Sequence, residues 1–263
     1  RHAAHGRLSS ARALARRTAG NSRQAADHLW LAGLLDAAQS QDEALVSYRR
    51  AVELEPNSGR AALGLLRALL AAGRREQADA ELRRMAAAMP ESEKASILGR
   101  AYQLFGDAQT AGSYFQLAVV ARPSDAAALR DLAAHFLLAG DAKKDDEALQ
   151  RLMSLPSPDN AAARNHIAWA RRTRARLLAA TGRYADYQAA VGLIEENQPS
   201  GGALRAEDLA VLASITLQRR DLRSLRHVIG HVERAQRERS LMGGEQLALA
   251  RMYQRSGRWR DCE

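Results

Sequence analysis

The chain has 263 residues, of which 46% are hydrophobic and 26% are charged, and these values are typical of a globular protein rather than a disordered or collagen-like one. Aromatic residues make up only 5%, whereas helix formers dominate, so the composition argues against a β-sandwich or β-barrel. The single cysteine, Cys262, excludes a disulfide framework within the chain and a multi-cysteine zinc site, and no apolar run reaches the roughly 18 residues of a membrane span.

The formal net charge is +9, and the positive charge gathers at the two ends. Residues 1–26 contain six Arg and no acidic residue, residues 27–159 are slightly acidic, and residues 160–263 are again basic. Basic ends can attract nucleic acid, anionic lipid or acidic proteins. Arg outnumbers Lys by 36 to 3, however, and this ratio fits a coding bias toward Arg as well as it fits a selected patch.

Along the chain, residues Ser9 to Ala19 predict a lone helix, and three residue types then share one period. Prolines recur at intervals of 34, 33 and 33 residues, at Pro56, Pro90, Pro123 and Pro156. Glycines recur at intervals of 33 and 34 residues, at Gly73, Gly106 and Gly140. Small alanines recur at intervals of 34, 33 and 37 residues, at Ala44, Ala78, Ala111 and Ala148. A shared period of this length indicates an internal structural repeat.

Each repeat predicts two amphipathic helices, and the punctuating residues explain how they are joined. Gly73 lies where the chain reverses between two helices, because glycine adopts a left-handed conformation at little cost. Pro90 follows the second helix and ends it. The recurring alanine lies where the paired helices must approach closely, because a larger side chain would push them apart. Ser40 and Glu43 have the spacing of a capping box, which predicts a helix start just before Ala44.

These residues resemble the tetratricopeptide repeat family, whose unit of 34 residues is a helix–turn–helix with a W-x2-L-G-x2-Y start, an A-x3-F second helix and a closing Pro. The third repeat matches best, with Leu98-Gly99-x2-Tyr102, Gly106, Ala111-x3-Phe115, Ala118 and Pro123. The fourth keeps Phe136, Gly140, Ala148 and Leu152, with about three extra residues, Ala142 to Lys144, expected in its turn. The resemblance implies an all-α fold, a right-handed α-solenoid of stacked helical hairpins.

The resemblance is strongest over residues 25–158, which we expect to form four repeats. Residues 159–263 predict two to three divergent hairpins, with Gly182 in one turn, Arg171 and Arg174 at places where the family usually has apolar residues, and a last hairpin cut short. Residues 1–24 predict the second helix of an upstream repeat. We therefore expect the sequence to be a fragment of a longer chain.

No phosphate-binding, zinc-protease or nucleophile-elbow motif is present, so we expect no catalysis by these residues, no cofactor and no metal. His227 and His231 are four residues apart on a predicted helix, but only Glu233 is close in sequence, and we expect surface or seam histidines. The run Asp145-Asp146-Glu147 is interpreted as favourable charge at a helix N-terminus. Trp30 is expected to pack against the preceding hairpin, and Cys262 to be the small residue of a following helix.

Arginines supply the candidate binding residues. The repeat register places Arg60, Arg67, Arg100 and Arg130 on the groove face of successive first helices, with Glu93 among them. Such a ladder can hold carboxylates or phosphates, because a guanidinium presents a planar bidentate fork. The alternative is that these arginines are solvated or pair with local acids. A second basic cluster, Arg171, Arg172, Arg174 and Arg176, has only Trp169 beside it, whereas RNA binding favours interleaved aromatic residues.

Three functions remain open from the sequence. The favoured one, implied by the resemblance, is a scaffold that binds a peptide or helical segment of a partner protein in a concave groove, and the arginine ladder would suit an acidic partner. The second is a repeat region that recruits substrates or regulates a larger enzyme or transcription regulator. The third is binding of an anionic surface or nucleic acid through the basic ends, which the sequence does not favour. The bacterial cytoplasm is a default expectation only, and an exported location stays open.

Overall fold

The protein is all-α. The computed structural model describes residues 2–20, 22–156, 160–199, 202–219 and 221–258, with the backbone alone for residues 2–9. These residues form fourteen helices and no strand. The chain divides into two compact units, Arg1–Ala142 and Lys143–Glu263. None of the helices in the described part is long and apolar enough to cross a membrane.

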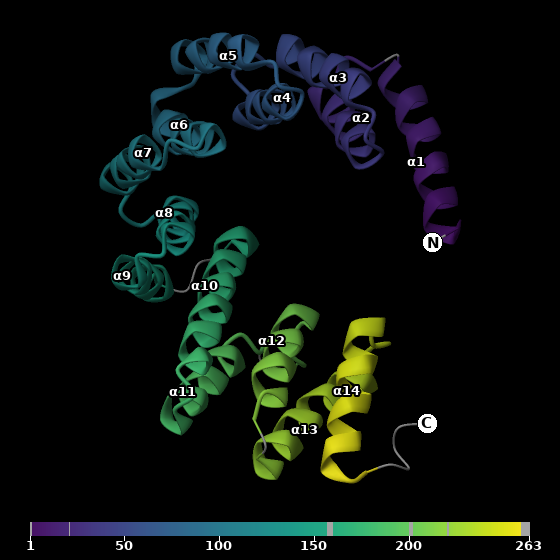
Figure 1. Cartoon of the computed structure of the whole chain (residues 1–263), viewed down its shortest axis with the longest axis vertical. Coiled ribbons are helices and arrows are strands. Elements are labelled where there is room, and N and C mark those ends of the chain that lie inside the picture. Colours follow the sequence, from purple (N-terminus) through teal and green to yellow (C-terminus); the bar gives the residue numbers. More distant parts are fainter. Residues whose placement is uncertain (1, 21, 157–159, 200–201, 220, 259–263) are drawn as a thin grey trace. The chain divides into compact units, whose positions relative to one another are not determined.

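The first unit contains eight helices in its described residues (Figure 1). They are α1 (His2–Gly20), α2 (Ala25–Ala37), α3 (Gln41–Leu54), α4 (Gly59–Ala71), α5 (Arg75–Ala88), α6 (Glu91–Phe105), α7 (Ala108–Ala121) and α8 (Ala126–Ala139). Helices α2 and α3, α4 and α5, and α6 and α7 pair as hairpins, and α2, α4, α6 and α8 pack one against the next. Within this unit, Figure 1 shows α2, α4, α6 and α8 on the inner side of an arc and α3, α5 and α7 on its outer side. The predicted solenoid of helical hairpins is confirmed.

The turns form where glycine was predicted to allow them. Gly73, Gly106 and Gly140 have φ values of 69°, 80° and 73°, in the left-handed region that glycine adopts without a steric penalty. In the first repeat the same place is taken by Gln39, whose φ of 58° makes it the one non-glycine residue with positive φ in the described part of the chain. Asp107 caps the next helix by accepting a hydrogen bond from the Thr110 N–H at 3.0 Å.

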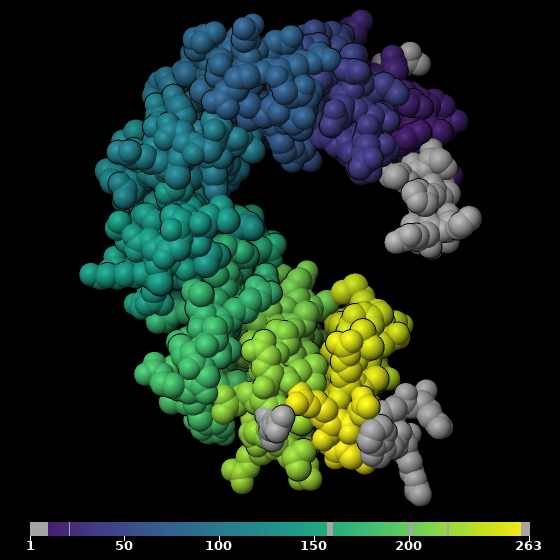
Figure 2. Space-filling view, in the orientation of Figure 1, coloured from purple at the N-terminus to yellow at the C-terminus, as the bar shows by residue number. Residues whose placement is uncertain are grey.

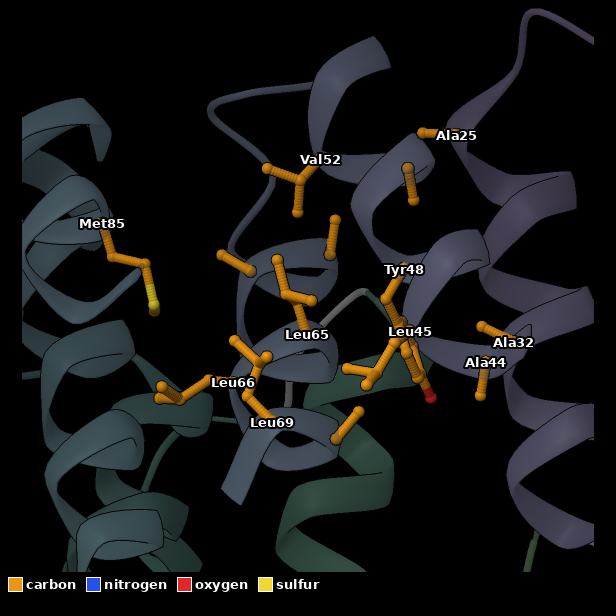
Figure 3. Close-up of a cluster of buried hydrophobic side chains, with 14 of the residues drawn as sticks. Ala25, Ala32, Ala44, Leu45, Tyr48, Val52, Leu65, Leu66, Leu69 and Met85 are labelled. Atoms are coloured by element: carbon orange, nitrogen blue, oxygen red, sulfur yellow. The ribbon is translucent and has the colours of Figure 1, made fainter. Parts of the chain in front are cut away.

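The core of the first unit is a seam that runs from hairpin to hairpin (Figure 3). Ala44, Ala78 and Ala111 are fully buried, as expected for the small residue that lets paired helices approach. Gly99 serves the same purpose on α6, since a Cβ atom at this position would lie 2.7 Å from the Phe115 ring on α7. Close approach of the helices therefore depends on the size of these side chains, as the repeat pattern indicates.

The second unit is built in the same way. Its helices are α9 (Ala142–Met153), which begins at the last residue of the first unit, and α10 (Ala161–Ala180), α11 (Tyr184–Glu195), α12 (Ala206–Leu217), α13 (Leu222–Glu238) and α14 (Gly243–Ser256). Helices α10 and α11 form one hairpin and α12 and α13 the next, while α14 packs against both α12 and α13. A second apolar cluster fills these hairpins, with Ile194, Leu212, Val228 and Met252 fully buried.

Three local expectations are corrected. The first helix begins at His2 rather than Ser9. Residues 142–144 are the first turn of α9 and not an insertion in the turn before it, because Gly140 already reverses the chain. Ser40 makes no side-chain capping bond to α3, since its φ and ψ of −88° and 67° leave the extended region that a cap requires. Asp145 does lie in the first turn of α9, as the helix N-terminal interpretation expects, and it is also buried. The expectation for Cys262 lies outside the described residues.

Candidate binding surface

The first helices of unit 1 form a continuous face, since α2, α4, α6 and α8 pack side by side. The space-filling view in Figure 2 shows this unit, coloured purple to teal, as an uninterrupted curved band. The structure places all four candidate arginines on these helices: Arg60 and Arg67 on α4, Arg100 on α6 and Arg130 on α8. All four lie on first helices, but they differ in their partners.

Arg67 belongs to a polar network at the end of α2. Its Nη2 donates to the Tyr48 hydroxyl at 3.1 Å and lies 3.4 Å from Asp36 Oδ2. The same hydroxyl donates to Asp36 at 2.8 Å. Burial, together with the Asp36 carboxylate, raises the pKa of Tyr48, so the phenol stays protonated and donates. Arg67 and Asp36 also line a pocket of about 300 Å³.

Arg100 is held by Asp131 from the next first helix. Its Nε and Nη2 lie 2.8 Å and 3.0 Å from the two carboxylate oxygens, which is a bidentate pair between α6 and α8. The arginine side chain is 49% exposed and that of Asp131 is 15% exposed. A partner that approaches this face therefore meets the Arg100 guanidinium more readily than the Asp131 carboxylate.

The remaining two arginines differ in exposure. Arg60 is exposed near the start of α4 and has no ion pair to any residue that the structure describes. Arg130 is half-buried and already has a partner within the chain. The four arginines are thus not a uniform ladder of free cations. Two of them pair with acids, Arg67 with Asp36 and Arg100 with Asp131. The sequence pattern indicated only Glu93 as an acid among these arginines.

Apolar side chains accompany the arginines on the first helices. Leu137 and Leu138 on α8 are 40% and 74% exposed, and Leu104 on α6 is 39% exposed. Trp30 on α2 was expected to be packed, but it is 43% exposed, because the neighbouring Leu31 and not the indole takes the buried position. The face therefore offers both guanidinium groups and apolar contact area.

The basic cluster of unit 2 is largely neutralised by local acids. The Nε atom of Arg171 lies 3.0 Å from Glu196 Oε2, Arg172 pairs with the fully buried Asp208, and Arg174 pairs with Asp146. These pairs explain why arginines replace apolar residues at this point of the repeat. They also weaken the attraction of this helix for a polyanion. Arg176 remains exposed on the same helix.

The two histidines of α13 meet a carboxylate that is distant in sequence. His227 Nε2 and His231 Nε2 lie 2.5 Å and 3.0 Å from the same atom, Glu195 Oε1, at the end of α11. Glu233, the acid closest in sequence, instead accepts hydrogen bonds from the Tyr253 hydroxyl and from Arg258. Sequence spacing identified the histidine pair but not its third member, because Glu195 arrives from the preceding hairpin.

Comparison with known proteins gives a family match over part of the chain. A tetratricopeptide repeat model matches residues 37–101, which run from the end of α2 to α6. No curated protein gives a significant match.

Solved structures with a similar course of the chain include a tetratricopeptide repeat protein from Parabacteroides merdae, at 16% identity and a TM-score of 0.45, covering 95% of this chain and 94% of that one. They also include the APC/C hetero-tetramer Cut9–Hcn1, at 16% identity and a TM-score of 0.45, covering 94% of this chain. The present chain spans 46% of the length of that protein. A third is MamA from Desulfovibrio magneticus RS-1, at 20% identity and a TM-score of 0.35, covering 51% and 76% of the two chains. The match indicates tetratricopeptide repeat sequence over residues 37–101, and stacked helical hairpins continue on either side of this segment.

Proposed function

We propose that the first unit is a protein-interaction scaffold that binds an acidic peptide or amphipathic helix on the face of α2, α4, α6 and α8. The tetratricopeptide fold supports a role in protein interaction in general, and such proteins are generally non-catalytic. The observation that carries the finer proposal is the presence of exposed guanidinium groups on the adjacent helices α4 and α6 beside exposed leucines on α6 and α8.

The ion pairs within the face leave donors for a partner. A guanidinium has five N–H donors. Arg100 uses its Nε and Nη2 on Asp131, so that its Nη1 is still available, and its side chain is 49% exposed. Arg67 is 61% exposed, and Arg60 has no acidic partner among the described residues. A carboxylate of a bound peptide would thus join these pairs rather than having to break them.

Fluorescence anisotropy with labelled helical peptides tests this proposal. Peptides with a Glu-rich polar face and a Leu-rich apolar face are compared with the same peptides carrying Lys in place of Glu. We expect the acidic peptides to bind more tightly, and the triple variant Arg60→Glu, Arg67→Glu, Arg100→Glu to weaken their binding by at least about tenfold, since each lost charged hydrogen bond contributes roughly 1.5–3 kcal/mol.

The triple variant Arg49→Glu, Arg50→Glu, Arg83→Glu is the matched control, because these are three exposed arginines on the outer helices α3 and α5. This variant changes the net charge in the same direction without touching the first helices. Equal loss of binding in both variants would mean that net charge alone drives association. Unchanged binding in the triple variant, with its circular dichroism also unchanged, would refute the role of these arginines.

A further inference from the structure

Three side chains converge at the surface of unit 2, outside the face described above. His227 and His231 lie one helical turn apart on α13, and their rings meet edge to face with centroids 5.1 Å apart. Both Nε2 atoms point at Glu195 Oε1, from 2.5 Å and 3.0 Å. Glu195 is the last residue of α11, so the three side chains join the second helices of two successive hairpins.

The geometry of this cluster fits a metal ion. One donor atom from each of the three residues lies within 4.8 Å of the other two. Zinc binds imidazole nitrogen and carboxylate oxygen at about 2.0–2.2 Å, and tetrahedral angles then separate the donors by about 3.4 Å. The present separations of 2.5 Å and 3.0 Å between histidine and carboxylate need to open by less than about 1 Å for an ion to enter.

The surroundings also favour a cation. The C-terminal end of a helix carries a partial negative charge, and Glu195 occupies the end of α11. The site is partly sheltered, because the side chains of His231 and Glu195 are 17% and 34% exposed. That of His227 is 53% exposed and keeps the cluster open to solvent on one side. Three protein ligands with an open fourth position are the arrangement in which water or an outside donor completes the coordination of zinc.

We propose that Glu195, His227 and His231 form a binding site for a divalent transition-metal ion of the zinc class, with a fourth position left for water. The ligand set of two imidazoles and one carboxylate selects such ions over Mg²⁺ and Ca²⁺, which prefer oxygen ligands. The ion clamps α11 to α13 and thereby stabilises two adjacent hairpins of unit 2.

Isothermal titration of the untagged full chain with Zn²⁺ tests the proposal, with Mg²⁺ as the comparison. We expect one ion per chain and no response to Mg²⁺. Thermal unfolding gives a second measurement. At a free Zn²⁺ concentration of about 100 times the dissociation constant, we expect the unfolding midpoint to rise by roughly 5–10 °C.

Variants assign the binding to these residues. His227→Ala and Glu195→Gln are each expected to lower the affinity for Zn²⁺ more than about tenfold and to remove the thermal shift. His28→Ala, which removes a histidine from α2 in the other unit, and Cys262→Ser, which removes the only thiol, are expected to retain both. No binding of Zn²⁺ at micromolar concentrations, or binding that survives the loss of His227, would overturn the proposal. Neither result bears on peptide binding by unit 1.

Discussion

Asp145 gives the sharpest prediction about stability, because it is a buried acid without a partner. It is 1% exposed in the first turn of α9, and neither carboxylate oxygen has a hydrogen bond within the described part of the chain. Burial, and then the charge of Asp146, raises the pKa of Asp145 to about 6 from its ordinary 3.8. Burial thus outweighs the favourable helix N-terminus that the sequence suggested.

The direction of the pH effect follows from the raised pKa. Between about pH 4 and pH 6 the folded state binds more protons at this site than the unfolded state does, so the free energy of unfolding decreases as pH rises. Above about pH 6 both states are ionised and the cost is constant. A shift of about two pKa units corresponds to roughly 3 kcal/mol, at about 1.4 kcal/mol per unit.

Asp145→Asn removes this charge and keeps the shape of the side chain. We expect the variant to be more stable than the wild type by about 1–3 kcal/mol at pH 8 and equal to it at pH 4, since the buried amide still lacks partners. Urea unfolding followed by circular dichroism, repeated from pH 4 to pH 8, measures the difference. Glu147→Gln is the control, because Glu147 is an exposed acid on the same helix. A gain that does not depend on pH, or a loss of stability at pH 8, would refute the reasoning.

Three further predictions concern packing and charge. Ala111→Trp should destabilise unit 1 by at least about 1–3 kcal/mol, because Ala111 is fully buried between paired helices, and a wild-type unfolding midpoint would disprove the repeat register. Burial lowers the pKa of His135. Between about pH 7 and pH 5 the unfolded state therefore binds more protons at this site than the folded state, and the free energy of unfolding decreases as the pH falls. His135→Leu should flatten this slope in a pH series of urea unfolding curves. Arg172→Ala should lower the free energy of unfolding by roughly 3 kcal/mol, because it leaves Asp208 buried without its cation. Adding Asp208→Asn to this variant should recover part of the loss, measured by thermal unfolding.

The fold could be predicted because each geometric requirement of the repeat is met by one residue type at a fixed position. Gly106 is needed for positive φ, Ala111 for close approach and Pro123 to end a helix, and each can be recognised without a partner. Gln39 shows where this fails, since it takes a left-handed conformation that a search for glycine misses.

The candidate site could be predicted only in part, because its chemistry depends on partners from other hairpins. The sequence placed Arg67 and Arg100 on first helices, but their acids Asp36 and Asp131 lie 31 residues away in each case. Burial of Asp145 was hidden for a related reason: a run of three acids normally indicates a solvated surface, and only tertiary packing shows which of them is enclosed.

The two apolar clusters bear on how the chain unfolds. One runs through α1 to α6, with Leu66 and Met85 among its fully buried residues, and the other through α10 to α14 around Ile194 and Leu212. In a stack where each hairpin contacts its neighbours, cooperativity spreads by nearest-neighbour coupling and is not shared by the whole chain at once. Unfolding should then proceed in more than one step. A peptide on α4 would delay one of these transitions and a metal ion on α13 the other, so a single melting curve can report two separate binding events.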